Sequence, residues 1–269
     1  AGRSHQCIVI NTDDADIVIF NDGQHMGRSG DKASSVSVSY RRADDLSEVA
    51  REWTAAGIDE LANAAPWRTF RWHRGQKHYS GTYWSSTIGN HVIYESRLEL
   101  ARLLFADFDT SVQNIVAQPF LLRASVDRKL RKHVPDFLLV TNTGPVVVDV
   151  KPARRLADPE VAFTFEWTRE LVEAKGWRYE VATEPIAAEL QNVRFLSGYR
   201  RNWLFRSELL TRVRGKDLDG LTLADALKCL PDEPVQHVKS SLLHLVWRQE
   251  LLIDLSAPLS GRTELRRPA

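Results

Sequence analysis

Short apolar runs separated by turn residues fill the middle of the chain. Residues 134–140 and 145–152 each contain such a run, and Thr-Asn-Thr-Gly stands between them at 141–144. Apolar runs of this length on either side of a Gly-containing turn predict the two strands of a β-hairpin. Similar runs at 115–122 and 177–183 predict further strands.

Two segments beside these runs show helical spacing instead. In residues 95–107, apolar side chains recur every three or four positions, as on the buried face of a helix. A second helix is expected to begin after Asp158, which can cap it, with Pro159 in its first turn, and to close at Gly176. Helices that alternate with strands predict an α/β protein with a mixed sheet flanked by helices.

The two ends of the chain show weaker patterns. Residues 1–66 combine a predicted strand pair with a predicted helix at 44–63, and form an N-terminal extension of unknown role. Residues 67–204 would contain a hairpin region and the α/β domain. In residues 205–269, two helical patterns precede two strand-like segments, which is the element order of a small winged-helix-like domain.

The net charge of +1 is unevenly distributed along the chain. Residues 1–66 hold 11 acidic and 6 basic side chains, a net of −5, so the remaining residues carry +6. Within this basic part, residues 68–78 interleave aromatic side chains with cations and contain no acid. This pattern makes Arg71, Arg74 and Lys77 candidate DNA contacts. It fits equally well a hairpin whose arginine stems cover packed aromatic rings.

Several classes of protein and site are not expected. No stretch approaches the ~20 apolar residues that span a bilayer, and the first residues lack the pattern of a secretory signal, so the cytoplasm is the expected compartment. Cys7 and Cys229 lie far apart and predict neither a disulfide framework nor a zinc motif. The histidines lack zinc-ligand spacing. No Gly-rich phosphate loop is present, so nucleotide hydrolysis is not expected.

Candidate catalytic residues gather at one end of the predicted hairpin. Asp149 and Lys151 are two positions apart in a strand and therefore point to the same face. Asp136 opens the preceding strand, so pairing across the turn would bring the two carboxylates together. Such a cluster can hold Mg²⁺, which favours oxygen ligands and can activate water to attack a phosphodiester. A lysine beside the ion can orient that water and stabilise the developing charge.

A third acid is expected from the helix at 95–107. Glu95 and Glu99 lie four positions apart on one helical face, and their spacing leaves both open. An alternative for the hairpin residues is a simple ion pair, which would contribute only ~0–1 kcal/mol and would not explain why two acids converge. The pattern therefore predicts an endonuclease of the PD-(D/E)xK class that depends on Mg²⁺, with Mn²⁺ as a substitute.

The region from about residue 94 to residue 199 resembles the TnsA family, the endonuclease subunits of heteromeric bacterial transposases. The resemblance implies a restriction-endonuclease-like fold. It also places Glu99, ahead of Glu95, at the catalytic glutamate position of the family. Four segments carry the resemblance: YESRLELARLLFADFDTSVQNIVAQPFLL, HVPDFLLV, VVVDVKPARRL and NVRFLSGYR.

The same resemblance implies catalytic roles for Asp136, Asp149 and Lys151, with the two aspartates and Glu99 as metal ligands. The best-known member of the family carries glutamine at the middle position. Asp149 instead restores the general D-x-K pattern of restriction-type nucleases, which supports metal binding.

The resemblance also implies a role and partners. The role is cleavage of the 5′ (non-transferred) strand at transposon ends during DNA transposition, while a separate DDE-type transposase subunit acts on the 3′ ends. Residues 205–269 would contact an ATP-dependent regulator of transposition. Arg154 and Arg155 are further candidate DNA contacts, although a solvated turn would explain them as well.

Two other functions are compatible with the sequence. A stand-alone restriction or repair endonuclease of the same fold would cut DNA without a partner. A non-catalytic DNA-binding or bridging module would act through the basic hairpin and the winged helix. The complete set of two acids and a lysine favours a catalytic protein, since a module without activity would be free to lose it.

Overall fold

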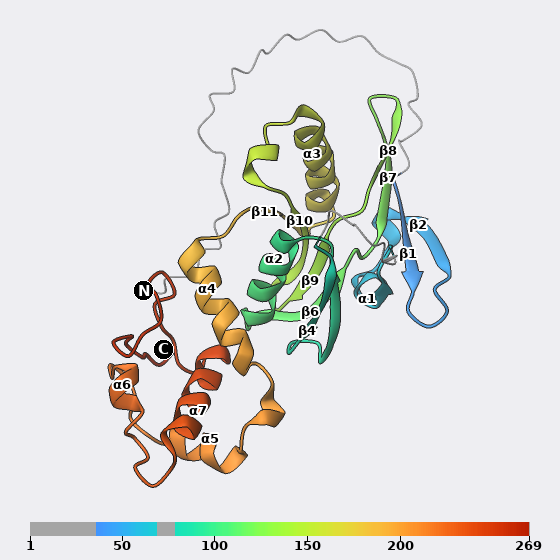
Figure 1. The fold of residues 1–269 in the computed structure, drawn as a ribbon. Helices are drawn as coiled ribbons and strands as arrows, with labels where there is room; N and C mark the ends of the chain where they lie inside the picture. The colour runs from blue at the N-terminus through green and yellow to red at the C-terminus, as the bar shows by residue number, and fades with distance from the viewer. Residues whose placement is uncertain (1–35, 69–78, 269) are drawn as a thin grey trace.

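The computed structural model describes residues 36–68 and 79–268. Its centre is a four-stranded mixed sheet of order β11-β10-β9-β6, in which β10 and β11 run parallel and the other neighbours run antiparallel (Figure 1). The hairpin predicted around the Thr-Asn-Thr-Gly turn is confirmed as β9 and β10. The strands are β6 (Val112–Ala117), β9 (Phe137–Thr141), β10 (Gly144–Val150) and β11 (Arg178–Ala182).

Helices cover both faces of this sheet, because β10 is apolar on both sides. Val146 and Val148 pack in one core with α2, whereas Val147 packs in a second core with α3. Asp158 caps α3 and Pro159 is its first residue, as the sequence predicts. The mixed α/β architecture is therefore confirmed. The helices are α2 (Arg97–Phe108), α3 (Pro159–Ala174) and α4 (Ala187–Leu196).

A second sheet of order β2-β1-β7-β8, with β3 attached to β1, lies beside the first (Figure 1). It joins the front of the chain to the α/β region, since β1 pairs antiparallel with β7. Trp53 and Leu61 pack in the same core as Val147 and Phe165. Residues 36–66 thus share a sheet and a core with the domain that follows. The strands are β1 (Ser37–Arg42), β2 (Glu48–Glu52), β3 (Ala64–Ala65), β7 (Leu121–Val126) and β8 (Lys129–His133).

The helix predicted for residues 44–63 is wrong over most of its length. Glu48–Glu52 form β2, and only Ile58–Ala62 form an α-helix, α1. Leu46 adopts a positive φ of 59° in the turn before β2, which runs back along β1. The pairing of the two strands outweighs the helical preference of the segment. The strand pair predicted near the N-terminus lies outside the described residues.

The region predicted as hairpins contains one in its described part, formed by β4 (Gly81–Ser85) and β5 (Asn90–Tyr94). The buried carboxylate of Asp107 in α2 binds the turn between β4 and β5. It accepts hydrogen bonds from the hydroxyls of Tyr83 and Ser85 at 2.7 and 2.6 Å and from the backbone N–H of Thr87 at 2.8 Å. Burial and the nearby Asp107 raise the pKa of Tyr83, so its hydroxyl remains a donor. Asp107 is therefore a structural carboxylate.

Residues 205–269 add helices that pack against α2 and α4 (Figure 1). The Trp247 ring lies 5.2 Å from that of Phe108, and its Nε1 donates to Ser86 Oγ at 3.2 Å. The two strand-like segments meet in an isolated bridge between Leu252 and Arg266. The winged-helix assignment therefore stays a prediction. The helices are α5 (Ser207–Arg214), α6 (Leu223–Ala226) and α7 (Val235–Trp247).

The sequence predicts that the chain has neither a membrane-spanning segment nor a disulfide framework. Among the described residues, no helix has both the length and the apolar character needed to cross a membrane. Cys229 is a free thiol. Cys7 lies outside the described residues.

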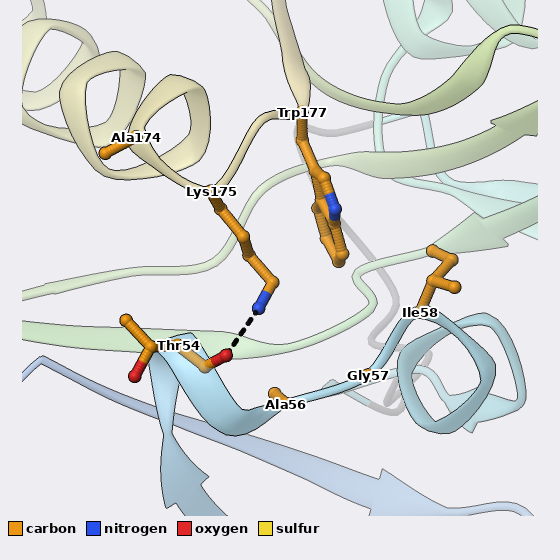
Figure 2. Close-up of a pocket in the computed structure, with 7 residues that line it drawn as sticks. All are labelled: Thr54, Ala56, Gly57, Ile58, Ala174, Lys175 and Trp177. Carbon is orange, nitrogen blue, oxygen red and sulfur yellow. Dashed lines mark hydrogen bonds between the residues drawn. The ribbon is translucent and has the colours of Figure 1, made fainter.

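A cavity of about 440 Å³ separates the end of α3 from the segment before α1 (Figure 2). Lys175 crosses it, and its Nζ donates to the backbone carbonyls of Trp53 and Thr54 at 2.8 and 3.4 Å. The same ammonium group lies 4.9 and 5.2 Å from the ring centres of Trp53 and Trp177. Burial lowers the pKa of Lys175. None of the lining residues is a candidate catalytic residue. The contacts of Lys175 therefore have a structural role, because they connect the end of α3 to the segment before α1.

Replacing Lys175 by methionine should lower the free energy of unfolding by about 1–2 kcal/mol, because the stem remains but the charged hydrogen bond is lost. Chemical denaturation measures this change. Lys228→Met is the control, since that side chain is 77% exposed and its ion pair in the described structure is with Asp225, three positions earlier. Equal decreases in the free energy of unfolding of both variants would contradict a stabilising role for Lys175.

Candidate active site

The β9–β10 hairpin brings Asp136 and Asp149 together. Val148 pairs with Phe137, so the next residue outward on each strand is one of the two aspartates. Asp149 follows Val147 by two positions and therefore points to the same face, toward α3. The sequence prediction that the two carboxylates converge at the strand ends agrees with this register.

Asp136 is held by hydrogen bonds at both its side chain and its backbone. Its Oδ2 accepts from the backbone N–H of Val150 at 2.6 Å, and its carbonyl accepts from the N–H of Gln118 at 2.8 Å. Burial, Asp149 and Glu99, in that order, raise the pKa of Asp136 well above its usual range. The surroundings of Asp136 therefore disfavour the charged form of its carboxyl group.

Asp149 is almost fully buried, with 2% of its surface exposed, and both its oxygens are engaged. His133 Nε2 lies 2.9 and 2.8 Å from Oδ1 and Oδ2, and the Tyr179 hydroxyl donates to Oδ2. Since an ionised carboxylate only accepts, Nε2 carries the proton when Asp149 is charged. Burial and Asp149 raise the pKa of Tyr179, which keeps this hydroxyl a donor.

His133 and Tyr179 are therefore parts of the site that sequence reasoning missed. The histidines lack zinc-ligand spacing, but that spacing does not test whether His133 orients a carboxylate. Its position at the end of a strand, three residues before Asp136, was the available signal. Tyr179 pairs with Val147 across the parallel β10–β11 register and so lies two positions along that ladder from Asp149. Only the pairing of β10 with β11 reveals that neighbourhood.

Lys151 follows β10, and its backbone N–H donates to the carbonyl of Ala182 at 2.9 Å. Its ammonium group lies 5.9 Å from the ring centre of Phe165 in α3. The positive charge of Lys151 acts on both Asp136 and Glu99, and opposes the rise in the pKa of each. The lysine and the carboxylates therefore occupy one electrostatic environment, as the D-x-K spacing predicts.

The prediction that Glu95 and Glu99 share one helical face is wrong, because α2 begins at Arg97 after the Ser96 cap and leaves Glu95 outside the helix. Glu99 is a half-buried residue whose Oε2 accepts from the backbone N–H of Glu95 at 2.7 Å, and burial raises the pKa of its carboxyl. The carboxylate of Glu95 instead lies 3.7 Å from Arg68 Nη1. Glu99 is the one that acts on the pKa of Asp136. The geometry favours Glu99 as the third acid.

Gln118 is a third residue near the site to which the sequence assigned no role. It is buried and has a positive φ of 46°, which is uncommon for a residue with a side chain. Its N–H donates to the Asp136 carbonyl, while its Oε1 accepts from the N–H of Arg68 at 3.0 Å. Gln118 thus braces the backbone that carries Asp136.

The predicted DNA contacts have different outcomes. Arg154 and Arg155 lie in a short 3-10 turn, Ala153–Arg155, directly after the lysine strand. Arg155 Nη2 lies 3.1 Å from Asp158 Oδ2, so its charge is already paired. Arg71, Arg74 and Lys77 lie outside the described residues.

The donor atoms suit a hard divalent cation by their chemistry. Within the described part of the chain, no three His, Cys, Asp or Glu side chains stand in positions that could hold a metal ion. Glu99, Asp136 and Asp149 each accept a hydrogen bond from the protein instead. Their charges nevertheless oppose one another, and a bound cation would relieve that repulsion. The residues fit a divalent metal if the carboxylates turn toward it.

Comparison with known protein families gives a match that covers the strands of the site. Residues 109–184 match a family model described as TnsA-like endonuclease N terminal. The match includes Asp136, Asp149 and Lys151, together with His133, and it begins after Glu99. No curated protein matches the chain. The matched region is therefore a TnsA-like endonuclease domain, related to transposition.

Proposed function

Starting from a TnsA-like endonuclease domain at residues 109–184, we propose that the protein is the metal-dependent endonuclease subunit of a heteromeric transposase. The observation that carries this proposal is the pair of carboxylates formed by the half-buried Asp136 and the buried Asp149, which act on one another beside Lys151. Two like charges in a buried position are costly unless a cation or a proton neutralises them. A metal ion bound in a nuclease site would neutralise this repulsion.

The residues of the site would divide the work as follows. Asp136, Asp149 and Glu99 would hold Mg²⁺, or Mn²⁺ in its place. Bound there, the ion would lower the pKa of a water molecule and neutralise charge on the phosphate. Lys151 would orient the attacking water and stabilise negative charge on the phosphoryl oxygens.

Hydrolysis would join the oxygen of water to phosphorus and break the bond from phosphorus to the 3′ oxygen. The leaving 3′ oxygen would take up a proton, so the products are a 5′-phosphate and a 3′-hydroxyl. His133 and Tyr179 would hold Asp149 in one orientation throughout, because both donate to its oxygens.

The proposed substrate is DNA at the ends of a transposon, cut on the 5′ (non-transferred) strand. A DDE-type transposase subunit would cut and join the 3′ ends and would supply most of the sequence specificity. Residues 205–269 would contact an ATP-dependent regulator of transposition.

A nicking assay tests the proposal. The purified chain is incubated with transposon-end DNA and Mg²⁺ or Mn²⁺, with and without the transposase subunit. Cleavage that depends on the partner and on the metal is the expected result. Efficient cutting by the chain alone would favour a stand-alone restriction or repair endonuclease. Absence of cutting in every combination would leave a non-catalytic bridging module.

The orientation of Asp149 provides a separate prediction. Replacing His133 by alanine should weaken Mn²⁺ binding by about 10–100-fold, as is typical when a residue that orients a metal ligand is lost. Titration of the protein with Mn²⁺, followed by electron paramagnetic resonance of the free ion, measures this affinity without cleavage.

His91→Ala is the matched control, because this exposed histidine of β5 contacts none of the site residues in the described structure. Unchanged Mn²⁺ affinity in the His133 variant would show that Asp149 does not need this partner.

A further inference from the structure

The hairpin formed by β7 and β8 extends beyond the sheet that carries it (Figure 1). β1 pairs with β7 only at residues 121–123, whereas β7 and β8 pair as far out as Val126 and Lys129. Within the described residues, the outer half of this hairpin is therefore a two-stranded ribbon with no third strand beside it. Asp127 and Arg128 close its turn with φ values of 52° and 58°, the left-handed conformation of a tight hairpin turn.

The ribbon carries a cluster of cations. Arg128, Lys129, Arg131 and Lys132 fall within five consecutive residues. In the described part of the chain, none of the four has an ion pair with an acid, in contrast to the arginines of α5. The Nε of Arg131 is buried without a hydrogen-bond partner. Unpaired cations on a projecting element are available to an external anion.

The cations lead directly to the candidate active site. β8 ends at His133, which contacts Asp149. Because side chains alternate along a strand, Lys129 and Arg131 share the face of His133. That face is turned toward α3, where Arg131 lies 4.8 Å from the ring centre of Phe163. Lys129 and Arg131 therefore form a row of positive charge that leads toward the carboxylates on this face, and Lys132 adds a charge on the opposite face of the ribbon, beside Leu130.

The dimensions of this row suit a nucleic-acid backbone. From residue 129 to residue 133, a strand rises about 13 Å. A DNA strand advances about 3.4 Å per phosphate along the helix axis, so the row spans about four nucleotides. The major groove of a duplex is wide enough to accept a two-stranded ribbon.

From this geometry we propose that the β7–β8 hairpin is an arm that binds the phosphates of duplex DNA beside the cleavage site. The proposal rests on the proposed nuclease function, and it identifies the surface that holds the substrate. Lysines on an edge strand can also serve only to prevent unwanted strand pairing. That explanation predicts no change in DNA affinity when the lysines are removed.

Charge removal distinguishes these explanations. The full chain with Lys129→Gln and Lys132→Gln is titrated into a fluorescein-labelled DNA duplex in EDTA, and anisotropy is followed at several salt concentrations. Binding should weaken about tenfold, and the slope of log K against log salt should become shallower by up to about 1.8, which is two phosphate contacts. Affinity and slope equal to those of the parent chain would overturn the proposal.

The matched control removes two charges from the other hairpin of the same sheet, with Arg41→Gln and Arg42→Gln. Arg42 already pairs with Asp44 at 2.6 Å, so this variant should bind DNA with nearly the parental salt slope. An equal loss in both double variants would show a general charge effect and would overturn the arm.

Photocross-linking provides a second test that does not depend on affinity. Leu130 at the arm and Leu46 in the β1–β2 turn are 66% and 56% exposed. With p-benzoylphenylalanine in place of either leucine, cross-links to the duplex should form from position 130 and not from position 46. Absence of a cross-link at position 130 while the protein is bound would contradict the arm.

The outcome is separable from that of the nuclease proposal, because binding and cross-linking are measured without cleavage. A chain that binds through the arm and never cuts would support the arm and refute the nuclease. A chain that cuts normally without the two lysines would refute the arm alone.

Discussion

Replacing Lys151 by alanine should reduce DNA cleavage by about 10²–10³-fold, the usual effect of losing one group that stabilises charge in a transition state. Lys151 provides the positive charge that acts on both Asp136 and Glu99. Duplex binding should change little, because the cations of the proposed arm remain. Single-turnover cleavage in the presence of the transposase subunit measures the rate, and anisotropy measures binding.

Lys175→Met is the matched control for this loss. Both lysines lie near aromatic rings, but Lys175 bridges backbone carbonyls at the other end of α3. The two variants should differ in cleavage: Lys151→Ala loses cleavage even at a temperature where it is fully folded, whereas Lys175→Met loses stability and keeps cleavage at a permissive temperature. Normal cleavage by the Lys151 variant would refute the catalytic role.

Replacing Asp136 by asparagine should abolish metal-dependent cleavage and, at neutral pH, stabilise the metal-free protein. Burial, Asp149 and Glu99 raise the pKa of Asp136 in the folded state. The folded state therefore binds a proton more readily than the unfolded state, so wild-type stability decreases as the pH rises from the usual range of an aspartate through this raised pKa. Asparagine carries no charge, and its carbonyl can still accept from the Val150 N–H.

Thermal unfolding without metal measures the effect. The melting temperature of Asp136→Asn should exceed that of the wild type at pH 7 by about 2–4 °C for each kcal/mol of repulsion removed. The gap should narrow as the pH is lowered, since the wild-type carboxyl then becomes protonated. Added Mn²⁺ should raise the melting temperature of the wild type and have much less effect on the variant.

Asp107→Asn is the control of opposite sign. The Asp107 carboxylate is buried but accepts hydrogen bonds from hydroxyl and backbone donors of the β4–β5 hairpin. An asparagine NH₂ would face some of those donors, so this variant should be less stable at neutral pH. Destabilisation by Asp136→Asn of similar size would show that Asp136 is a structural carboxylate too.

The proposed β7–β8 arm and the candidate active site share one strand, β8. DNA held along β8 would lie next to His133, which contacts Asp149. The strand that holds the substrate and the side chain that orients a proposed metal ligand therefore belong to one element. Defects in binding, in metal affinity and in cleavage should consequently be separable, at the arm, at His133 and at Lys151 respectively.

The sequence determined the local part of this site. A four-residue turn keeps β9 and β10 adjacent, so Asp136 and Asp149 meet through pairing that needs no distant contact. The alternation of a strand places Asp149 and Lys151 on one face. Asp158 and Pro159 likewise marked the start of α3, because a cap acts within one helical turn.

Only the tertiary structure decided the rest, since it depends on contacts between residues far apart in the chain. His133 belongs to the second sheet and Asp149 to the first, and their contact requires both sheets to pack on α3. The start of α2 at Arg97, after the Ser96 cap, leaves Glu95 outside the helix and Glu99 in its first turn, although the four-residue spacing treats them alike. The pairing of β2 with β1 turned a segment with helical character into a strand, because the hydrogen bonds gained across the sheet exceed a local preference of a few tenths of a kcal/mol per residue.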